Sequence, residues 1–156
     1  MVDASSRAPP PSPQILIGID YGLRRVGVAA GDTLTCRARP LPAIPAHDGV
    51  PDWAQLDRLC KDIGPARVVV GCPYHIDGSE GDWTKRVRNF AADLGKRWSL
   101  PVSLVDERFT SQDAKTELRD ARASGVRSKR VVRAAIDSGA AALILERWMS
   151  GEGEDR

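Results

Sequence analysis

The sequence predicts an α/β fold in which a mixed sheet of five strands, three antiparallel and then two parallel, is flanked by helices. Apolar, β-branched segments follow one another closely near the start of the chain, which indicates a meander of short strands. Further along, short apolar segments alternate with amphipathic helical ones, which indicates parallel pairing. With 156 residues, 42% of them apolar, the chain is long enough for one domain with a core and too short for two.

The first half of the chain supplies the meander and one helix. Residues 15–20 and 25–31 are apolar segments joined by "YGLR", and the extended stretch "LTCRARPLPAI" at 34–44 follows the turn signal "GD". The segment "PDWAQLDRLCKDIG", residues 51–64, opens with Pro and Asp, carries an apolar stripe at helical spacing and ends at a glycine. Three strands and an amphipathic helix are therefore expected here.

The second half alternates strands and helices. Short apolar runs at 66–71 and 101–107 indicate strands, and the segment 82–98 between them indicates a helix. A further helix is expected from about Ser111 to Ala123, and "RAAIDSGAAALILERWM", residues 133–149, is the strongest helical pattern. This order of strands and helices along the chain predicts a mixed sheet covered by helices.

The two ends of the chain have the composition of tails. Residues 1–13 are rich in Ser and Pro and are expected to be a disordered tail, and residues 151–156 a flexible one. The domain is expected to span residues 14–150. No run reaches the roughly 18 apolar residues of a membrane span, so we expect no membrane partner.

Cysteine usage favours a reducing compartment. Cys36, Cys60 and Cys72 are odd in number and widely spaced, which predicts neither a disulfide framework nor a zinc site. A cytoplasmic location is the expectation.

Basic residues gather in two stretches of the chain. Residues 115–133 contain seven Lys or Arg and two acids, and a second basic run lies within residues 84–98. Such runs can be solvated helix faces or a surface that binds phosphates, and the sequence leaves both open.

An aspartate ends the first apolar strand. By strand alternation Asp20 shares a face with Leu16 and Gly18, while the three isoleucines of the segment take the other face. Gly18 is expected to leave open space beside the carboxylate, because a glycine inside a strand often marks a close approach by a ligand or another backbone. The alternative is an ordinary turn aspartate that bonds its own backbone.

Two acids follow one another at the end of the last expected strand. Asp106 shares a face with Val102 and Leu104, and Glu107 takes the other face. Either acid is a candidate for a site, and the alternative is an ion pair with Arg108 or a charge at the strand exit.

A third acid heads an apolar stripe on the final helix. Asp137 is followed at helical spacing by Ala140, Ala141, Ile144 and Trp148. The small residues beside it would let this turn press against the sheet. The carboxylate is therefore expected to point inward, the alternative being a favourable charge near a helix N-terminus.

Convergent carboxylates repel one another in a partly dry site unless a cation neutralises them. Oxygen ligands suit Mg²⁺ or Mn²⁺. Two such ions, roughly 3.5 to 4 Å apart, would activate a water and stabilise the leaving oxygen of a phosphodiester. This chemistry needs no histidine or serine nucleophile.

Several motifs, in order, resemble one family. They are "GIDYGLRRVGVA", "ARPLPAI", "VVVGCPYHIDGSEG", "VDERFTS" and "IDSGAAALILE". From about Ile15 to Met149 the chain resembles the YqgF family, also called RuvX, which comprises Holliday-junction-resolvase-like proteins assigned as pre-16S rRNA nucleases. The resemblance implies an RNase H-like fold, with Asp20, Glu107 and Asp137 as the catalytic, metal-binding acids.

The resemblance also implies a substrate. It points to ribosome maturation in the cytoplasm and to cleavage of precursor RNA near the 5′ end of the small-subunit rRNA. Junction-cleaving resolvases, which act on DNA, carry a further acid on the last helix where this chain has Ala140. Resolution of Holliday junctions is therefore the less favoured function.

Nucleic-acid contacts are expected beside these acids and in the basic loop 122–133. The candidates are Tyr21, Arg24, Arg25, Arg108, Arg127, Lys129 and Arg130, with His75 as a further possible substrate contact. A histidine in a surface loop is more often without such a role.

Two other functions are compatible with the sequence. One is a noncatalytic nucleic-acid or ribosome-associated binding module on the same fold. The other is an ATPase-type nucleotide-binding domain, because "GIDYG" resembles the first phosphate motif of the actin and sugar-kinase superfamily. That architecture needs two related domains, and the sequence contains no Walker-type motif.

Overall fold

A computed structural model describes residues 12–73, 79–106, 129–151 and 154–155, and for 129–138 and 154–155 it describes the backbone alone. The elements in chain order are β1 (Ile15–Asp20), β2 (Arg25–Asp32), β3 (Arg37–His47), β4 (Val50–Pro51), α1 (Trp53–Ile63), β5 (Arg67–Cys72), α2 (Asp82–Trp98), β6 (Val102–Asp106), α4 (Lys129–Met149) and β7 (Glu154–Asp155). None of the helices in these ranges is long and apolar enough to cross a bilayer.

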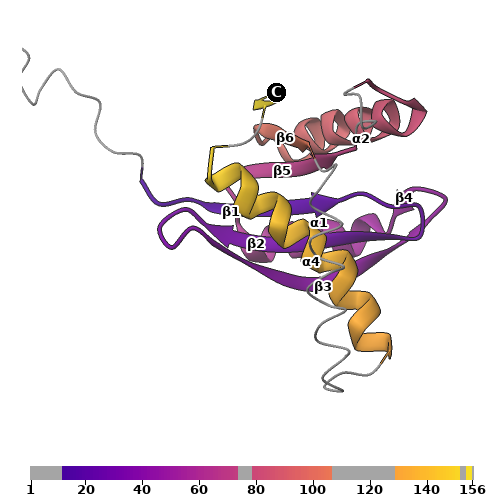
Figure 1. Ribbon diagram of the computed structural model, residues 1–156, viewed down its shortest axis with the longest axis horizontal. Helices are drawn as coiled ribbons and strands as arrows, with labels where there is room; N and C mark the ends of the chain where they lie inside the picture. Colours follow the sequence, from indigo (N-terminus) through magenta and orange to yellow (C-terminus); the bar gives the residue numbers. More distant parts are fainter. Residues whose placement is uncertain (1–11, 74–78, 107–128, 152–153, 156) are drawn as a thin grey trace, which may run out of the picture.

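The strands form one mixed sheet in the order β4-β3-β2-β1-β5-β6-β7 (Figure 1). β1, β2 and β3 pair antiparallel, whereas β5 pairs in parallel with both β1 and β6. The predicted arrangement of three antiparallel strands followed by two parallel ones is confirmed. The predicted count of five strands is too low, because β4 and β7 add two residues each at the edges.

The short strand β4 follows a tight turn. Asp48 and Gly49 both have positive φ values, 50° and 85°. An Asp-Gly pair is a strong signal for a two-residue hairpin turn, but a strand of two residues shows no alternation by which a sequence could reveal it. At the other edge β7 pairs antiparallel with β6, within the segment expected to be a tail.

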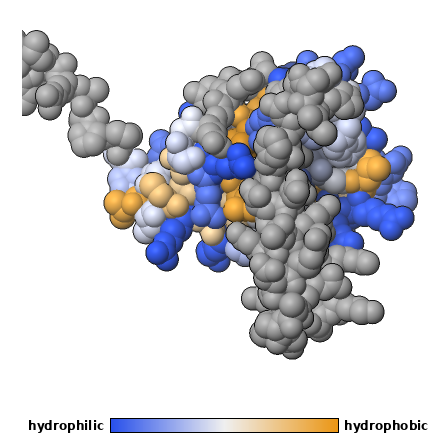
Figure 2. All heavy atoms as spheres, viewed as in Figure 1, coloured by the Kyte–Doolittle hydropathy of each residue, from blue (hydrophilic) through white to orange (hydrophobic). Residues whose placement is uncertain are grey.

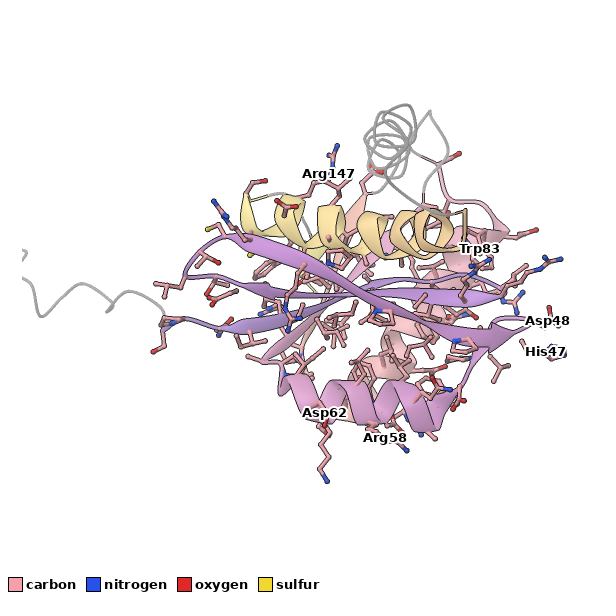
Figure 3. The ribbon with its side chains drawn as sticks, turned by 90° about the horizontal axis from the view of Figure 1, so that it is seen from below. His47, Asp48, Arg58, Asp62, Trp83 and Arg147 are labelled. Atoms are coloured by element: carbon pink, nitrogen blue, oxygen red, sulfur yellow. The ribbon has the colours of Figure 1, made fainter. Side chains whose placement is uncertain are left out.

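Helices cover both faces of the sheet (Figures 1 and 3). α4 packs across β1, β2 and β3 on one face, and α1 and α2 lie on the other. The two faces carry separate apolar clusters. The cluster under α4 contains Leu16, Ala29, Val69, Val105, Ala141, Ile144 and Leu145. The cluster facing α1 and α2 includes Ile17, Ile19, Leu56, Val68, Val70, Phe90, Leu94 and Leu104.

The helix ends follow the sequence signals. The Asp52 carboxylate accepts the backbone N–H of Gln55 at 3.2 Å, and Gly64 closes α1 in the left-handed conformation with φ 62°. α2 has the predicted bounds, and α4 begins at Lys129 rather than at the predicted Arg133. The helix expected between residues 111 and 123 lies outside the described ranges.

One ion pair ties α1 to α2 on the face away from α4. The Asp57 carboxylate accepts hydrogen bonds from Arg97 Nη2 at 2.6 Å and from Trp98 Nε1 at 2.8 Å. The hydrogen bond from Arg97 is the main cause that holds the pKa of Asp57 below its usual value. The Arg97 guanidinium also lies 4.3 Å from the centre of the Trp53 ring. These contacts fix the two helices relative to each other.

Large apolar side chains reach solvent at separate points. In the described ranges they are Ile15, Leu23, Leu34 and Val50, with exposed fractions of 40%, 42%, 71% and 60%. On the face shown in Figure 2, apolar surface likewise occurs as small areas among hydrophilic side chains. Leu23 lies in the turn after Asp20, and Val50 begins β4 directly after Gly49, whose N–H donates to the Leu23 carbonyl.

Candidate functional site

Three parallel strands end at one edge of the sheet. β1 ends at Asp20, β5 at Cys72 and β6 at Asp106, and the register pairs Cys72 with Asp106. Parallel strands bring their carboxyl ends to the same edge, where α/β proteins commonly bind ligands. We refer to it as the carboxyl edge.

The two described acids of this edge lie on opposite faces. Asp20 alternates with Leu16 and Gly18, and Leu16 belongs to the cluster under α4. Asp106 alternates with Val102 and Leu104, which belong to the cluster facing α1 and α2. Alternation therefore directs Asp20 toward α4 and Asp106 away from it.

Gly18 is a point of close contact between β1 and α4. A Cβ atom on Gly18 would lie 2.6 Å from Leu145 Cγ and 2.8 Å from the carbonyl oxygen of Ala141. The expectation of open space at Gly18 is therefore wrong, because the helix fills that space. A glycine inside a strand can mark a close approach by a ligand or by another backbone. At Gly18 the structure shows the close approach of another backbone, that of α4.

α4 runs in the direction opposite to β1. A Cβ on Gly31, the pairing partner of Leu16, would lie 3.1 Å from Leu145 Cδ1 and 3.5 Å from Met149 Cε, whereas a Cβ on Gly18 would meet Leu145 and Ala141. One helical turn toward the start of α4 thus corresponds to two residues toward the end of β1.

Two of the expected acids, Asp20 and Asp137, lie beyond the contact at Gly18 along β1 and α4. One turn before Ala141 the backbone of α4 reaches position 137, and two residues after Gly18 β1 reaches Asp20. The predicted buried stripe is present at Ala140, Ala141 and Ile144, which are 3%, 0% and 0% exposed. That Asp137 heads this stripe beside Asp20 stays a prediction.

Several expected site residues lie outside what the structure describes. Glu107, Arg108, Arg127 and His75 fall in undescribed ranges. Lys129, Arg130 and Asp137 belong to α4 by their backbone only, which places Lys129 and Arg130 in a helix rather than in the expected loop. Among the described residues no group of three or more His, Cys, Asp or Glu side chains could hold a metal ion.

Tyr21, which directly follows Asp20, packs in the core. Its side chain is 8% exposed, and its ring stacks on Phe90 and Trp83 with centroids 4.1 and 5.3 Å apart. Its hydroxyl donates a hydrogen bond to the Gly49 carbonyl. Tyr21 is therefore part of the core and fixes the chain directly after Asp20, and its expected contact with a phosphate stays a prediction.

The β1–β2 turn presents one of the expected arginines. Arg24 is exposed, and its carbonyl accepts the backbone N–H of Ala46 at 2.8 Å. Arg25 is half-buried at the start of β2. Sequence reasoning missed Trp83 and Arg86 of α2, which reach the same end of the sheet through Tyr21 and the Asp48–Gly49 turn.

A separate groove of about 620 Å³ lies at the opposite end of β1. Its lining includes Ile15, Arg37, Leu59 and Ile63. Because it is lined by the first residue of β1 rather than the last, it is not part of the carboxyl edge.

Comparison with known proteins places this architecture in a family. The family model described as "RuvX: Holliday junction resolvase" matches residues 14–151. A protein from Sodalis glossinidius named "Putative pre-16S rRNA nuclease" is 42% identical over 86% of this chain and 92% of its own length. Proteins of the same name from Azotobacter vinelandii and Francisella tularensis subsp. novicida are 40% and 37% identical, each over 88% of this chain and over 94% and 97% of their own.

A solved structure shares the fold. The RuvC structure from Thermus thermophilus aligns over 91% of this chain and 99% of its own, with a TM-score of 0.50 and 15% identity. The mixed sheet with helices on both faces is therefore the RNase H-like fold that the sequence motifs imply. The chain belongs to the RuvX family.

Proposed function

We propose that this chain is a nuclease that depends on Mg²⁺ or Mn²⁺, hydrolyses RNA phosphodiester bonds and processes the 5′ end of pre-16S rRNA in the cytoplasm. The observation that carries the proposal is that Asp20 ends a buried strand on the face covered by α4, which contacts that strand at Gly18 through Ala141 and Leu145. The names of the curated relatives support a nuclease and an rRNA precursor as its substrate.

The chemistry of the proposed ligands fits a hard divalent cation. Asp20, Glu107 and Asp137 offer only carboxylate oxygens, which Mg²⁺ and Mn²⁺ prefer. Cys72 ends β5 at the same edge, but its side chain belongs to the cluster on the opposite face. When bound, two such ions would supply an activated water and stabilise the leaving oxygen.

Strand geometry favours Glu107 over Asp106 as the second ligand. Asp106 shares the face of Leu104, away from α4. The residue after it is the one that continued alternation would direct toward α4 and Asp20. Glu107 lies outside the described residues, and its assignment is part of the proposal.

The chain's own residues hold the substrate and the acids in place. Strand β1 is buried at Leu16, Ile17 and Ile19, each 0% exposed, so the backbone that carries Asp20 is rigid. The contact at Gly18 sets the separation of β1 and α4. We propose Arg24, Arg25, Arg108, Arg127, Lys129 and Arg130 as contacts to the RNA backbone, with His75 as a further substrate contact.

The second candidate is cleavage of a four-way DNA junction. It is favoured by the description of the family model. Against it stands Ala140, which is 3% exposed at the position where junction resolvases are expected to carry another acid. We therefore keep RNA as the proposed substrate.

Metal removal tests the proposal. A transcript spanning the 5′ end of the small-subunit rRNA and its upstream leader should be cut when Mn²⁺ or Mg²⁺ is added, and cleavage should stop when EDTA is in excess. Gel analysis of end-labelled transcript, with a four-way DNA junction as the parallel substrate, gives the readout. Cleavage that persists in EDTA would rule out the metal-dependent mechanism, and faster cutting of the junction would favour the second candidate.

A further inference from the structure

The aromatic side chain of Trp83 lies close to the carboxyl edge. Trp83 is half-buried in the first turn of α2, and its ring is nearly parallel to that of Tyr21, at 13°. The Arg86 guanidinium lies 5.7 Å from the centre of the Trp83 ring. Because Tyr21 directly follows Asp20, this aromatic and cationic pair is joined to the strand end where the proposed chemistry takes place.

A hydrogen-bonded turn holds these groups together. Arg86 Nη2 donates to the Asp48 carbonyl at 2.6 Å, and the Tyr21 hydroxyl donates to the Gly49 carbonyl. The Gly49 N–H donates to the carbonyl of Leu23 at 2.9 Å. A Cβ on Gly49 would lie 2.5 Å from Arg86 Nη2 and 2.6 Å from the Tyr21 hydroxyl, so only glycine fits. The turns and the start of α2 are therefore held in place before any ligand binds.

The surface around Trp83 combines apolar and cationic side chains. Leu23 and Val50 are 42% and 60% exposed, and Arg24 and Arg86 are exposed as well. Figure 3 shows Trp83 at the same end of the molecule as Asp48. We call the surface formed by Leu23, Arg24, Val50, Trp83 and Arg86 the edge platform.

Aromatic rings with neighbouring cations are the usual surface for single-stranded nucleic acid. Bases that are not paired stack on aromatic side chains, while cations contact the phosphates. A duplex keeps its bases inside the stack and cannot use such a ring in this way. The basic run of α2 is thus more than a solvated helix face, because Arg86 is positioned at an aromatic ring.

We infer that the edge platform binds single-stranded RNA next to the bond that is cut, with a base stacked at Trp83 and a phosphate at Arg86. The inference rests on the proposed nuclease function. Asp20 faces α4, whereas Tyr21 and Trp83 lie on the opposite face of the same edge. An RNA strand held at Asp20 therefore reaches the edge platform by passing around the end of β1, and the enzyme requires an unpaired segment on that side.

Binding can be measured separately from cleavage. We would use full-length Asp20→Asn protein without added metal, and follow the anisotropy of a fluorescein-labelled 15-nucleotide single-stranded RNA and of a duplex RNA of the same sequence. Trp83→Ala should weaken binding of the single strand about 5- to 150-fold, which is the range for loss of one stacked base, and should leave the duplex unchanged. Trp83→Phe should recover most of the affinity.

Arg86 and a matched arginine give the second readout. Arg86→Gln should reduce the slope of log affinity against log salt by about 0.7, as expected for one lost phosphate contact to a single strand. Arg58→Gln, on the outer surface of α1 (Figure 3), should leave both the affinity and the slope unchanged.

Three results would overturn the inference. They are wild-type affinity of a folded Trp83→Ala protein for the single strand, equal loss of single-strand and duplex binding, and an unchanged salt slope for Arg86→Gln. If Trp83→Ala does not fold, the Trp83→Phe and Arg86→Gln proteins test the inference instead. Wild-type binding by Arg86→Gln at every salt concentration would contradict it. Failure of the nuclease proposal is distinguishable, because it shows as absence of metal-dependent cleavage by the wild-type protein whatever the binding results.

Discussion

The Asp20→Asn protein is expected to cleave RNA roughly 10²- to 10⁴-fold more slowly than the wild type in Mn²⁺. The amide preserves the size of the side chain at the end of β1 but removes the negative charge that would hold the cations. Loss of metal-assisted charge stabilisation is worth several kcal/mol, and each 1.36 kcal/mol corresponds to a factor of ten in rate. Single-turnover cleavage of the labelled transcript measures the effect.

A matched aspartate controls for the loss of one surface charge. Asp62 is exposed on α1 (Figure 3) and lines the groove at the opposite end of β1, so Asp62→Asn should cleave at a rate within about twofold of the wild type. The Asp20→Asn protein should still bind RNA, which separates loss of chemistry from loss of substrate. Wild-type cleavage by Asp20→Asn would remove Asp20 from the site, and no cleavage by the wild-type protein would favour a noncatalytic binding module.

Gly18→Val is expected to destabilise the protein and to reduce cleavage at the same time. A single added carbon already lies 2.6 Å from Leu145 Cγ and 2.8 Å from the Ala141 carbonyl oxygen, so α4 must move away from β1. Overpacking of this kind typically costs about 1–3 kcal/mol, and sometimes more, whereas the entropic gain from replacing a strand glycine is only about 0.5–1 kcal/mol. Steric repulsion therefore prevails, and urea unfolding monitored by circular dichroism should show the loss.

A second substitution identifies the cause of the Gly18 effect. Leu145→Ala alone should cost about 2–5 kcal/mol by leaving a cavity. The Gly18→Ala/Leu145→Ala double variant should lose less unfolding free energy than the Gly18→Ala and Leu145→Ala single variants lose together. The reason is that the new methyl group enters the space that Leu145 vacates. Full additivity, or an unfolding free energy of Gly18→Val equal to that of the wild type, would show that β1 and α4 are not in close contact there.

Much of the fold was accessible from local sequence patterns. The first turn and the end of α1 follow from Asp52 and Gly64, because their preferred conformations are those of helix caps. The order of the long strands follows from apolar segments that alternate with helices. The two short strands β4 and β7 could not be recognised, since two residues carry no periodicity.

The site was only partly accessible from the sequence. Strand alternation correctly grouped Asp20 with Gly18, but the same rule places Tyr21 with Ile17 and Ile19 in the core, so its burial could have been predicted. What fills the space at Gly18 depends on a helix more than 120 positions away in the sequence. Trp83 was missed for the same reason, because its stacking partner Tyr21 is brought to it only by the fold.

The affinity of the protein for Mn²⁺ tests most directly whether Asp20, Glu107 and Asp137 share one metal site. Calorimetric titrations would compare the wild type with Asp20→Asn, Glu107→Gln and Asp137→Asn, and with Asp106→Asn as the matched control. Substituting a residue that only supports a metal ligand typically lowers metal affinity about 10- to 100-fold. Each of the first three variants, which replaces a proposed ligand, should therefore lose at least about tenfold in Mn²⁺ affinity. Asp106→Asn should bind like the wild type. Unchanged Mn²⁺ affinity in Asp20→Asn, or a larger loss in Asp106→Asn than in Glu107→Gln, would contradict the proposed site.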